Sequence, residues 1–293
     1  MTRVALLWHM HQPFYQDLAT GEHILPWVRL HALKDYWGMV ALLREFPAAR
    51  VTFNLVPSML VQLEAFAKED AHDRHLTLGM RPAEQLTTEE RAYCVAELFH
   101  AHRATMIEPH PRYAELLAKR QAGGANAFSV EDLRDLQVWH KLVWVDQAYL
   151  DSDPRVAQLR DKGRNFTEED KQLLRDVELE ILRRVIPEYR EAIERGQIEV
   201  STSPFYHPIL PLLCDSDTYQ RTHPGARRPR EVFRRPEDAS LQLARAVTLH
   251  ERLFGRRPSG LWPSEGSVSD EIDRKSTRLN SSHVKRSRMP SSA

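Results

Sequence analysis

The segment Val4-Ala5-Leu6-Leu7-Trp8-His9-Met10-His11-Gln12-Pro13 decides the fold of this 293-residue chain. Its apolar run from Val4 to Trp8 is bounded by polar residues, which is typical of a strand buried in a parallel sheet. His9, His11 and Gln12 follow where such a strand would end. Active sites of α/β barrels are built at the carboxyl ends of the strands. The segment therefore predicts a first barrel strand that carries functional side chains at its end.

Three more short apolar segments predict strands, at residues 50–55, 198–201 and 260–262. A proline closely follows each of them, at Pro57, Pro204 and Pro263, and stops continued pairing. Helical patterns separate the strands, so the sequence predicts a parallel sheet covered by helices. The helical region from about residue 70 to residue 190 is longer than a simple crossover and predicts a helical insertion.

The charge is distributed unevenly along the chain, although the formal net charge is zero. Residues 274–293 contain six basic residues and no acidic one, so residues 1–273 carry a net charge of about −6. An acidic body gives no reason to expect a nucleic-acid partner. The last twenty residues have no apolar period and resemble adapter-derived sequence at the end of an assembled gene. They predict a disordered, non-native tail.

Cys94 and Cys214 are the only cysteines, and their separation predicts neither a disulfide framework nor a metal site. The chain enters its first strand without the apolar segment and small-residue cleavage site of a signal peptide. No apolar run approaches the roughly 18 residues that suggest a membrane span. The prediction is a protein of the reducing cytoplasm with no membrane partner.

The histidines near the first strand are the first candidate site residues. Alternation along a strand places His9 and His11 on one side, where they could bind sugar hydroxyls or a metal ion. They could equally be ordinary loop histidines. Zinc in a catalytic site needs three protein ligands and an open position, and His207 is the only later imidazole placed just after a predicted strand.

Two glutamates are the candidate carboxylates. Glu265 follows the last predicted strand, three residues after Trp262, and Glu199 lies inside the strand near residue 198. Retaining glycosidases use two carboxyl groups about 5–5.5 Å apart, one of them as a nucleophile. Either glutamate could instead be a surface charge. The aromatic and proline-rich segment 203–212 could line a sugar site or pack between the helices and the sheet.

Three segments resemble signature regions of glycoside hydrolase family 57. They are Trp8 to Tyr15, Gly196 to Val200 and Trp262 to Gly266, and they resemble the first three of five such regions, in the same order. Residues 25–36 resemble a stretch of its amylase and amylopullulanase-like members.

This resemblance implies an incomplete (β/α)7 TIM-like barrel, here without its C-terminal part, with a helical insertion. It also implies a retaining mechanism on α-glucans that needs no metal or organic cofactor. Glu265 is then the catalytic nucleophile. It places substrate contacts at His9, His11, Glu199 and Trp262, and Gln12 and His207 are further predicted substrate-binding residues.

The acid/base of this family is an aspartate in the fourth region, and nothing after Glu265 resembles that region. Asp270 and Asp273 are too close to Glu265 and fall in a predicted helix. The expectation is a glycoside hydrolase or transglycosidase whose chain, as given, is inactive. The alternatives are a metal-dependent barrel hydrolase that uses His9 and His11, and a non-catalytic carbohydrate-binding fragment.

Overall fold

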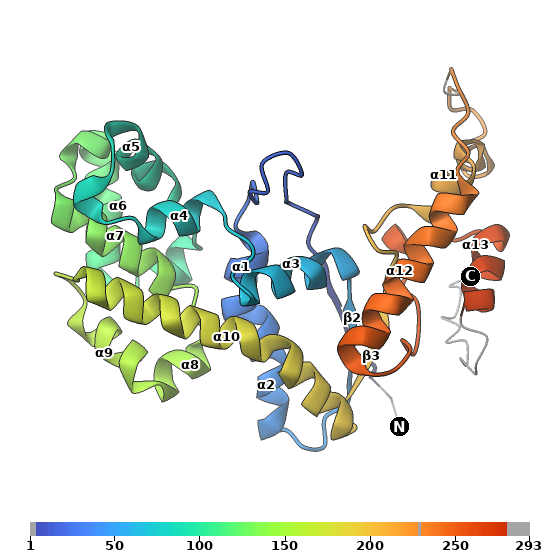
Figure 1. Ribbon diagram of the computed structural model, residues 1–293, viewed down its shortest axis with the longest axis horizontal. Coiled ribbons are helices and arrows are strands. Elements are labelled where there is room, and N and C mark those ends of the chain that lie inside the picture. The colour runs from blue at the N-terminus through green and yellow to red at the C-terminus, as the bar shows by residue number, and fades with distance from the viewer. Residues whose placement is uncertain (1–3, 228–229, 280–293) are drawn as a thin grey trace. The chain divides into compact units, whose positions relative to one another are not determined.

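The computed structural model describes residues 4–227 and 230–279 of the chain. It divides into two compact units (Figure 1). The sheet unit comprises Met1–Phe14, Phe46–Val61 and Tyr189–Ala293. The helical unit comprises Tyr15–Glu45 and Gln62–Glu188, so it begins well before the predicted boundary near residue 70.

Three parallel strands form the core of the sheet unit. They are β1 (Leu7–Met10), β2 (Val51–Leu55) and β3 (Ile198–Thr202), in the order β1-β2-β3. The register places His9 opposite Asn54 and Asn54 opposite Ser201. The predicted parallel sheet is therefore confirmed. Paired residues of parallel strands share a face, so these three side chains project from the same side of the sheet.

The fourth predicted strand is reduced to a single bridge. Leu261 forms one parallel bridge with Thr202, and the Trp262 N–H donates to the Thr202 carbonyl at 2.8 Å. Ser259 and Gly260 add hydrogen bonds to β3 on the other side of the bridge. Because Pro263 has no N–H, the pairing cannot continue past it. The segment nevertheless brings Trp262 and Glu265 to the carboxyl end of β3.

The described residues form an open, mixed α/β arrangement and not a closed barrel. β1 lies at the edge of the sheet, with β2 as its only strand neighbour among these residues. Leu7 and Trp8, whose side chains project from opposite faces of β1, are 41% and 47% exposed. The expectation of a fully buried first strand is thus wrong for β1, since such burial requires cover on both faces of the strand.

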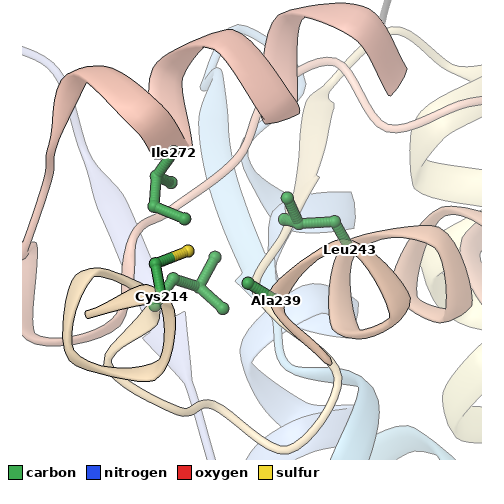
Figure 2. Close-up of a cluster of buried hydrophobic side chains, with 5 residues drawn as sticks. Cys214, Ala239, Leu243 and Ile272 are labelled. Atoms are coloured by element: carbon green, nitrogen blue, oxygen red, sulfur yellow. The ribbon is translucent and has the colours of Figure 1, made fainter. Parts of the chain in front are cut away.

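Three helices of the sheet unit enclose a small apolar core. These helices are α11 (Leu210–Cys214), α12 (Pro236–Phe254) and α13 (Asp270–Leu279), and α12 also contacts β3. Figure 2 shows the buried side chains that join them, which are Leu210, Cys214, Ala239, Leu243 and Ile272. Helix α12 ends at Gly255, whose φ of 68° is the left-handed conformation that closes many helices.

Helix α13 changes the predicted boundary of the tail. Residues 274–279 continue this helix, whereas the sequence assigned them to a disordered segment. An ion pair between Glu271 and Lys275, at 3.8 Å and four residues apart, supports the helical turn. The rest of the predicted tail, residues 280–293, lies outside the described residues.

The helical unit begins with a nearly continuous helical run. It consists of α1 (Trp27–His31), the π-turn η1 (Ala32–Tyr36), α2 (Trp37–Ala41) and the 3₁₀-turn η2 (Leu42–Glu45). The other complete helices of the unit are α4 (Arg74–Met80), α5 (Thr88–Glu97), α6 (Pro111–Gly123), α7 (Val130–Leu142), α8 (Gln147–Ser152) and α9 (Pro154–Lys162). Helices α3 (Pro57–Ala67) and α10 (Glu168–Glu194) contribute residues to both units.

Paired charges are buried inside the helical unit. Arg29 donates to both carboxylate oxygens of Asp73, at 2.7 and 3.1 Å. Lys141 donates to Glu178 at 2.9 Å, and each of these four side chains is at most 2% exposed. Buried charges are tolerated only when they are paired in this way. The Arg29–Asp73 pair joins α1 to the start of α4, and the Lys141–Glu178 pair joins α7 to α10.

Both cysteines are buried and free. Burial raises the pKa of the Cys214 thiol to about 11 and that of Cys94 to about 12. Neither thiol is therefore in the reactive thiolate form near neutral pH. In the part of the chain that the structure describes, no helix is both long enough and apolar enough to cross a membrane.

Candidate active site

Three imidazoles meet at the carboxyl end of the sheet. His9 belongs to β1, His11 follows it, and His207 comes from the loop after β3. The ring centroids of His11 and His207 are 4.2 Å apart, and those of His9 and His207 are 5.2 Å apart. His9 and His11 are separated by 5.8 Å. The structure thus brings together the three histidines that the sequence singled out, and we call them the histidine triad.

A buried hydrogen-bond network orients His9. Its Nδ1 lies 2.6 Å from Oδ1 of Asn54, whose amide nitrogen donates to Ser201 at 3.0 Å. Ser203 also donates to Asn54 Oδ1 at 3.0 Å. An amide oxygen only accepts, so Nδ1 of His9 carries the proton and its Nε2 is directed elsewhere. Asn54 fixes both the tautomer and the orientation of this ring.

The sequence interpretation missed Asn54 and its two serine partners. Asn54 is fully buried and lies near the end of the otherwise apolar strand β2. A buried amide in such a strand must find hydrogen-bond partners, which was the signal that could have identified it. Ser201 and Ser203 carry no comparable signal, because their importance depends on the pairing of β2 with β3.

Trp262 and Glu265 complete the site. The Trp262 ring stacks on His9 with a centroid separation of 5.6 Å and an interplanar angle of 27°. An oxygen of Glu265 lies 3.9 Å from Nδ1 of His207. The Glu265 side chain is 70% exposed, whereas that of His207 is 4% exposed. The carboxylate is therefore accessible from solvent next to a buried imidazole.

His207 and Glu265 occupy unusual backbone conformations. Their φ angles are 57° and 53°, in the left-handed region that residues other than glycine seldom adopt. Such conformations cost about 1–3 kcal/mol each and cluster at functional sites. Local hydrogen bonds, from the His207 N–H to Pro204 and from the Gly266 N–H to Pro263, hold both turns.

The surroundings favour neutral imidazoles. Burial lowers the pKa of His207 to about 4, and the nearby His11 and His9 rings act in the same direction. Burial, followed by the influence of His9, also lowers the pKa of His11, although the Glu265 carboxylate opposes this shift. Near neutral pH these rings can both donate and accept hydrogen bonds, or bind a metal ion.

Two predicted site residues lie at the margin of this arrangement. Glu199 is exposed within β3, where it pairs with Thr52. It shares a face with Ser201 but lies about 6.6 Å further back along the strand, at 3.3 Å per residue. The Gln12 carbonyl accepts a hydrogen bond from Ser58 at 2.8 Å, which anchors the loop after β1.

The donor set of the histidine triad also fits a metal ion. One ligand nitrogen from each ring lies within 4.8 Å of the others. Nε2 of His207 has no hydrogen-bond partner among the described residues. Three imidazoles with an open position are a known zinc environment.

A polar site at the carboxyl ends of parallel strands, with an exposed carboxylate next to oriented imidazoles, is the arrangement of an α/β enzyme. The family model of glycosyl hydrolase family 57 matches residues 5–279. The chain belongs to this family.

Solved structures give weaker similarities. AmyC, an α-amylase from Thermotoga maritima, is 14% identical with a TM-score of 0.44; the match covers 94% of this chain and 38% of AmyC. GH57 branching enzymes from Thermococcus kodakaraensis and Pyrococcus horikoshii are 17% and 18% identical, with TM-scores of 0.40 and 0.41. Each match covers 89% of this chain and 32% or 34% of the other enzyme. The chain thus spans about a third of the length of these proteins. No curated protein matches the sequence.

Proposed function

We propose that the chain carries part of the active site of a retaining glycoside hydrolase or transglycosidase that acts on α-glucans. Glu265 is the nucleophile in this proposal. His9, His11, Gln12, Glu199, His207 and Trp262 bind the sugar. The observation that carries the proposal is the accessible Glu265 carboxylate beside the histidine triad and Trp262, in a chain of glycosyl hydrolase family 57.

The chemistry follows from the position of Glu265. One carboxylate oxygen bonds to the anomeric carbon while the bond from that carbon to the leaving oxygen breaks. The leaving oxygen needs a proton, and the glycosyl-enzyme is then released by water or by a second sugar. The rings of His9 and His11 hold hydroxyl groups of the bound sugar, and the Trp262 face packs on its apolar side.

The family's proton donor is an aspartate of its fourth signature region, and no segment after Glu265 resembles that region. General acid catalysis of this kind contributes about 10²–10⁴-fold to a rate. We also infer that β1, β2 and β3 correspond to the first strands of the incomplete (β/α)7 barrel.

The experiment uses an α-glucosyl fluoride, because fluoride leaves without a proton donor. We expect a covalent glucosyl adduct on the peptide that contains Glu265, detected by mass spectrometry. The adduct should disappear in Glu265→Gln and persist in the control Glu251→Gln, which changes an exposed carboxylate of the same unit. An adduct on another residue would refute the role of Glu265. Glucan binding without any adduct would indicate a carbohydrate-binding fragment.

A metal-dependent hydrolase is the second candidate, because one ligand nitrogen from each ring of the histidine triad lies within 4.8 Å of the other two. Zinc content and activity on the fluoride, each measured before and after treatment with a chelator, separate the two proposals. Stoichiometric zinc that is required for turnover and lost in His207→Asn would favour the metal enzyme. Turnover that survives chelation would favour the glycosidase.

A further inference from the structure

A second group of metal-ligating side chains lies in the helical unit, and none of them belongs to the candidate active site. His75, Glu97 and His100 each offer one ligand atom, and these atoms lie within 4.8 Å of one another. His75 lies in the first turn of α4 and Glu97 is the last residue of α5. His100 follows α5 by three residues. The helical fold, and not a sequence motif, brings these three side chains together.

The buried member of this group has an unused nitrogen. His75 is 5% exposed, and its Nε2 has no hydrogen-bond partner among the described residues. Its Nδ1 lies 3.1 Å from the Tyr93 hydroxyl. When Nδ1–H donates to that oxygen, Nε2 presents a lone pair. A hydrogen-bond partner on the second nitrogen is the usual way in which proteins orient a metal-binding histidine.

The spacing of the other two donors matches a small tetrahedral ion. Nδ1 of His100 and Oε2 of Glu97 are 3.4 Å apart. Bonds of about 2.0–2.1 Å to a tetrahedral zinc ion place neighbouring donors about 3.3–3.4 Å apart. The Trp144 indole donates to the His100 carbonyl at 2.9 Å and fixes the loop that carries this ring.

The local charges permit a cation. Two nearby positive groups are buried and paired: Arg29 with Asp73 and Lys141 with Glu178, while Arg74 lies over the Tyr93 ring. Behind His75 lies the His140 ring, at a centroid separation of 5.7 Å. Burial lowers the pKa of His140 well below its usual range, so this ring adds no charge. The Glu97 carboxylate contributes the negative charge that a divalent ion requires.

We propose that His75, Glu97 and His100 form a zinc site that links α4 to the end of α5. Two imidazoles and one carboxylate are a common zinc ligand set, and they leave a fourth position for water. The Glu97 and His100 side chains are 35% and 44% exposed, so this position faces solvent. Such an ion cross-links two helices of the unit, and its binding raises the thermal stability of the folded protein.

The test uses the full chain and zinc chloride. We expect calorimetry to detect a zinc equivalent whose affinity falls at least tenfold in Glu97→Gln and in His100→Ala. Tyr93→Phe, which removes the partner of His75 Nδ1, should weaken it about 10–100-fold. His102→Ala is the matched control, because His102 is an exposed histidine two residues away. His207→Asn should leave this equivalent unchanged, which separates it from the histidine triad.

Crystals soaked in zinc give a readout that does not depend on the variants folding. An anomalous peak between the rings of His75 and His100, recorded at the zinc absorption edge, would support the site. A peak only at the histidine triad, or no bound zinc, would overturn the proposal. Unchanged affinity in folded Glu97→Gln and His100→Ala proteins would overturn it as well.

Discussion

The His207 imidazole and the Glu265 carboxylate approach to 3.9 Å from two backbone positions that both have a positive φ. Neither residue is a glycine, so each conformation depends on the turn around it. The loop after β3 and the segment after the Leu261 bridge supply these turns. The imidazole and the carboxylate therefore meet because β3 positions both loops: one follows β3 directly, and the other follows the Leu261 bridge to β3.

The stability of the sheet unit should depend on pH through His207. Its pKa falls from 6.5 to about 4 on folding, so the unfolded chain binds more protons between these values. The contribution of neutral His207 is fully present above pH 6.5 and is lost as the pH falls towards 4. His207→Asn, which tolerates a positive φ, should reduce this dependence. Urea unfolding across the range measures it.

The groups that face His207 define the control for this prediction. His11, His9 and Glu265 lie around the ring, and the first two disfavour its protonation. Glu265→Gln should therefore leave most of the pH dependence in place. An equal slope in wild type and His207→Asn would assign the effect to another group.

Replacing Asn54 should lower the stability of the sheet unit and release the His9 ring from its fixed orientation. Asn54→Ala removes the acceptor for His9 and leaves Ser201 and Ser203, the partners of two buried hydrogen bonds, unsatisfied, at a cost of about 1–3 kcal/mol each. Thr52→Ala, on the same strand and the same face, should have a smaller effect. Chemical denaturation measures stability, and the side-chain NMR signals of His9 report whether its tautomer is still fixed. Unaltered His9 signals in Asn54→Ala would contradict the assigned role.

Trp262 should contribute directly to glucan affinity. Trp262→Ala removes the aromatic face beside His9, and we expect about tenfold weaker maltooligosaccharide binding, which equals about 1.4 kcal/mol. Trp8 is adjacent to His9 in β1 and projects from the opposite face, so Trp8→Ala is the control. Calorimetric titration distinguishes the two. Equal losses in both variants would indicate a general effect on folding.

The buried charges of the helical unit should dominate its stability. Glu178→Gln leaves Lys141, Arg29 and Arg175 without their shared carboxylate, and breaking a buried pair costs about 3–5 kcal/mol. Glu180→Gln, two residues later on α10, removes an exposed pair with Arg155 and should cost at most about 1 kcal/mol. Thermal unfolding monitored by circular dichroism compares them. Similar losses would show that burial does not set the strength of these pairs.

Sequence patterns predicted where the strands of the sheet lie in the chain better than they predicted how deeply those strands are buried. Short apolar runs identified β1, β2 and β3 because strand patterns are local, and the alternation of His9 and His11 is equally local. The exposure of β1 was not predictable, since it depends on what covers the two faces of the strand. Residues 274–279 continue a helix whose earlier residue Ile272 packs into the apolar core, a contact that the composition of the tail does not reveal.

In the candidate site too, local features were predictable from the sequence and features that depend on strand pairing were not. Each member of the histidine triad was identified from its place after a predicted strand. The role of Asn54 depends on the register of β2 against both neighbours, which no single segment contains. In the second group, Glu97 and His100 are only three residues apart, but nothing in the sequence connects them to His75. The packing of α4 against α5 brings His75 to the other two.

The order of the segments has a consequence for how the protein is made. The sheet unit consists of three separate segments, with the helical unit inserted between them at two places. A ribosome releases β1 and β2 long before β3, because the whole of the longer helical segment lies between β2 and β3. Non-local strand pairing of this kind is slow to form. The early strands therefore remain unpaired on one side throughout much of synthesis, while helices with mainly local contacts can already fold. Until β3 is made, the edge of β2 that later pairs with β3 has no strand partner, so we expect a chaperone to bind at this edge.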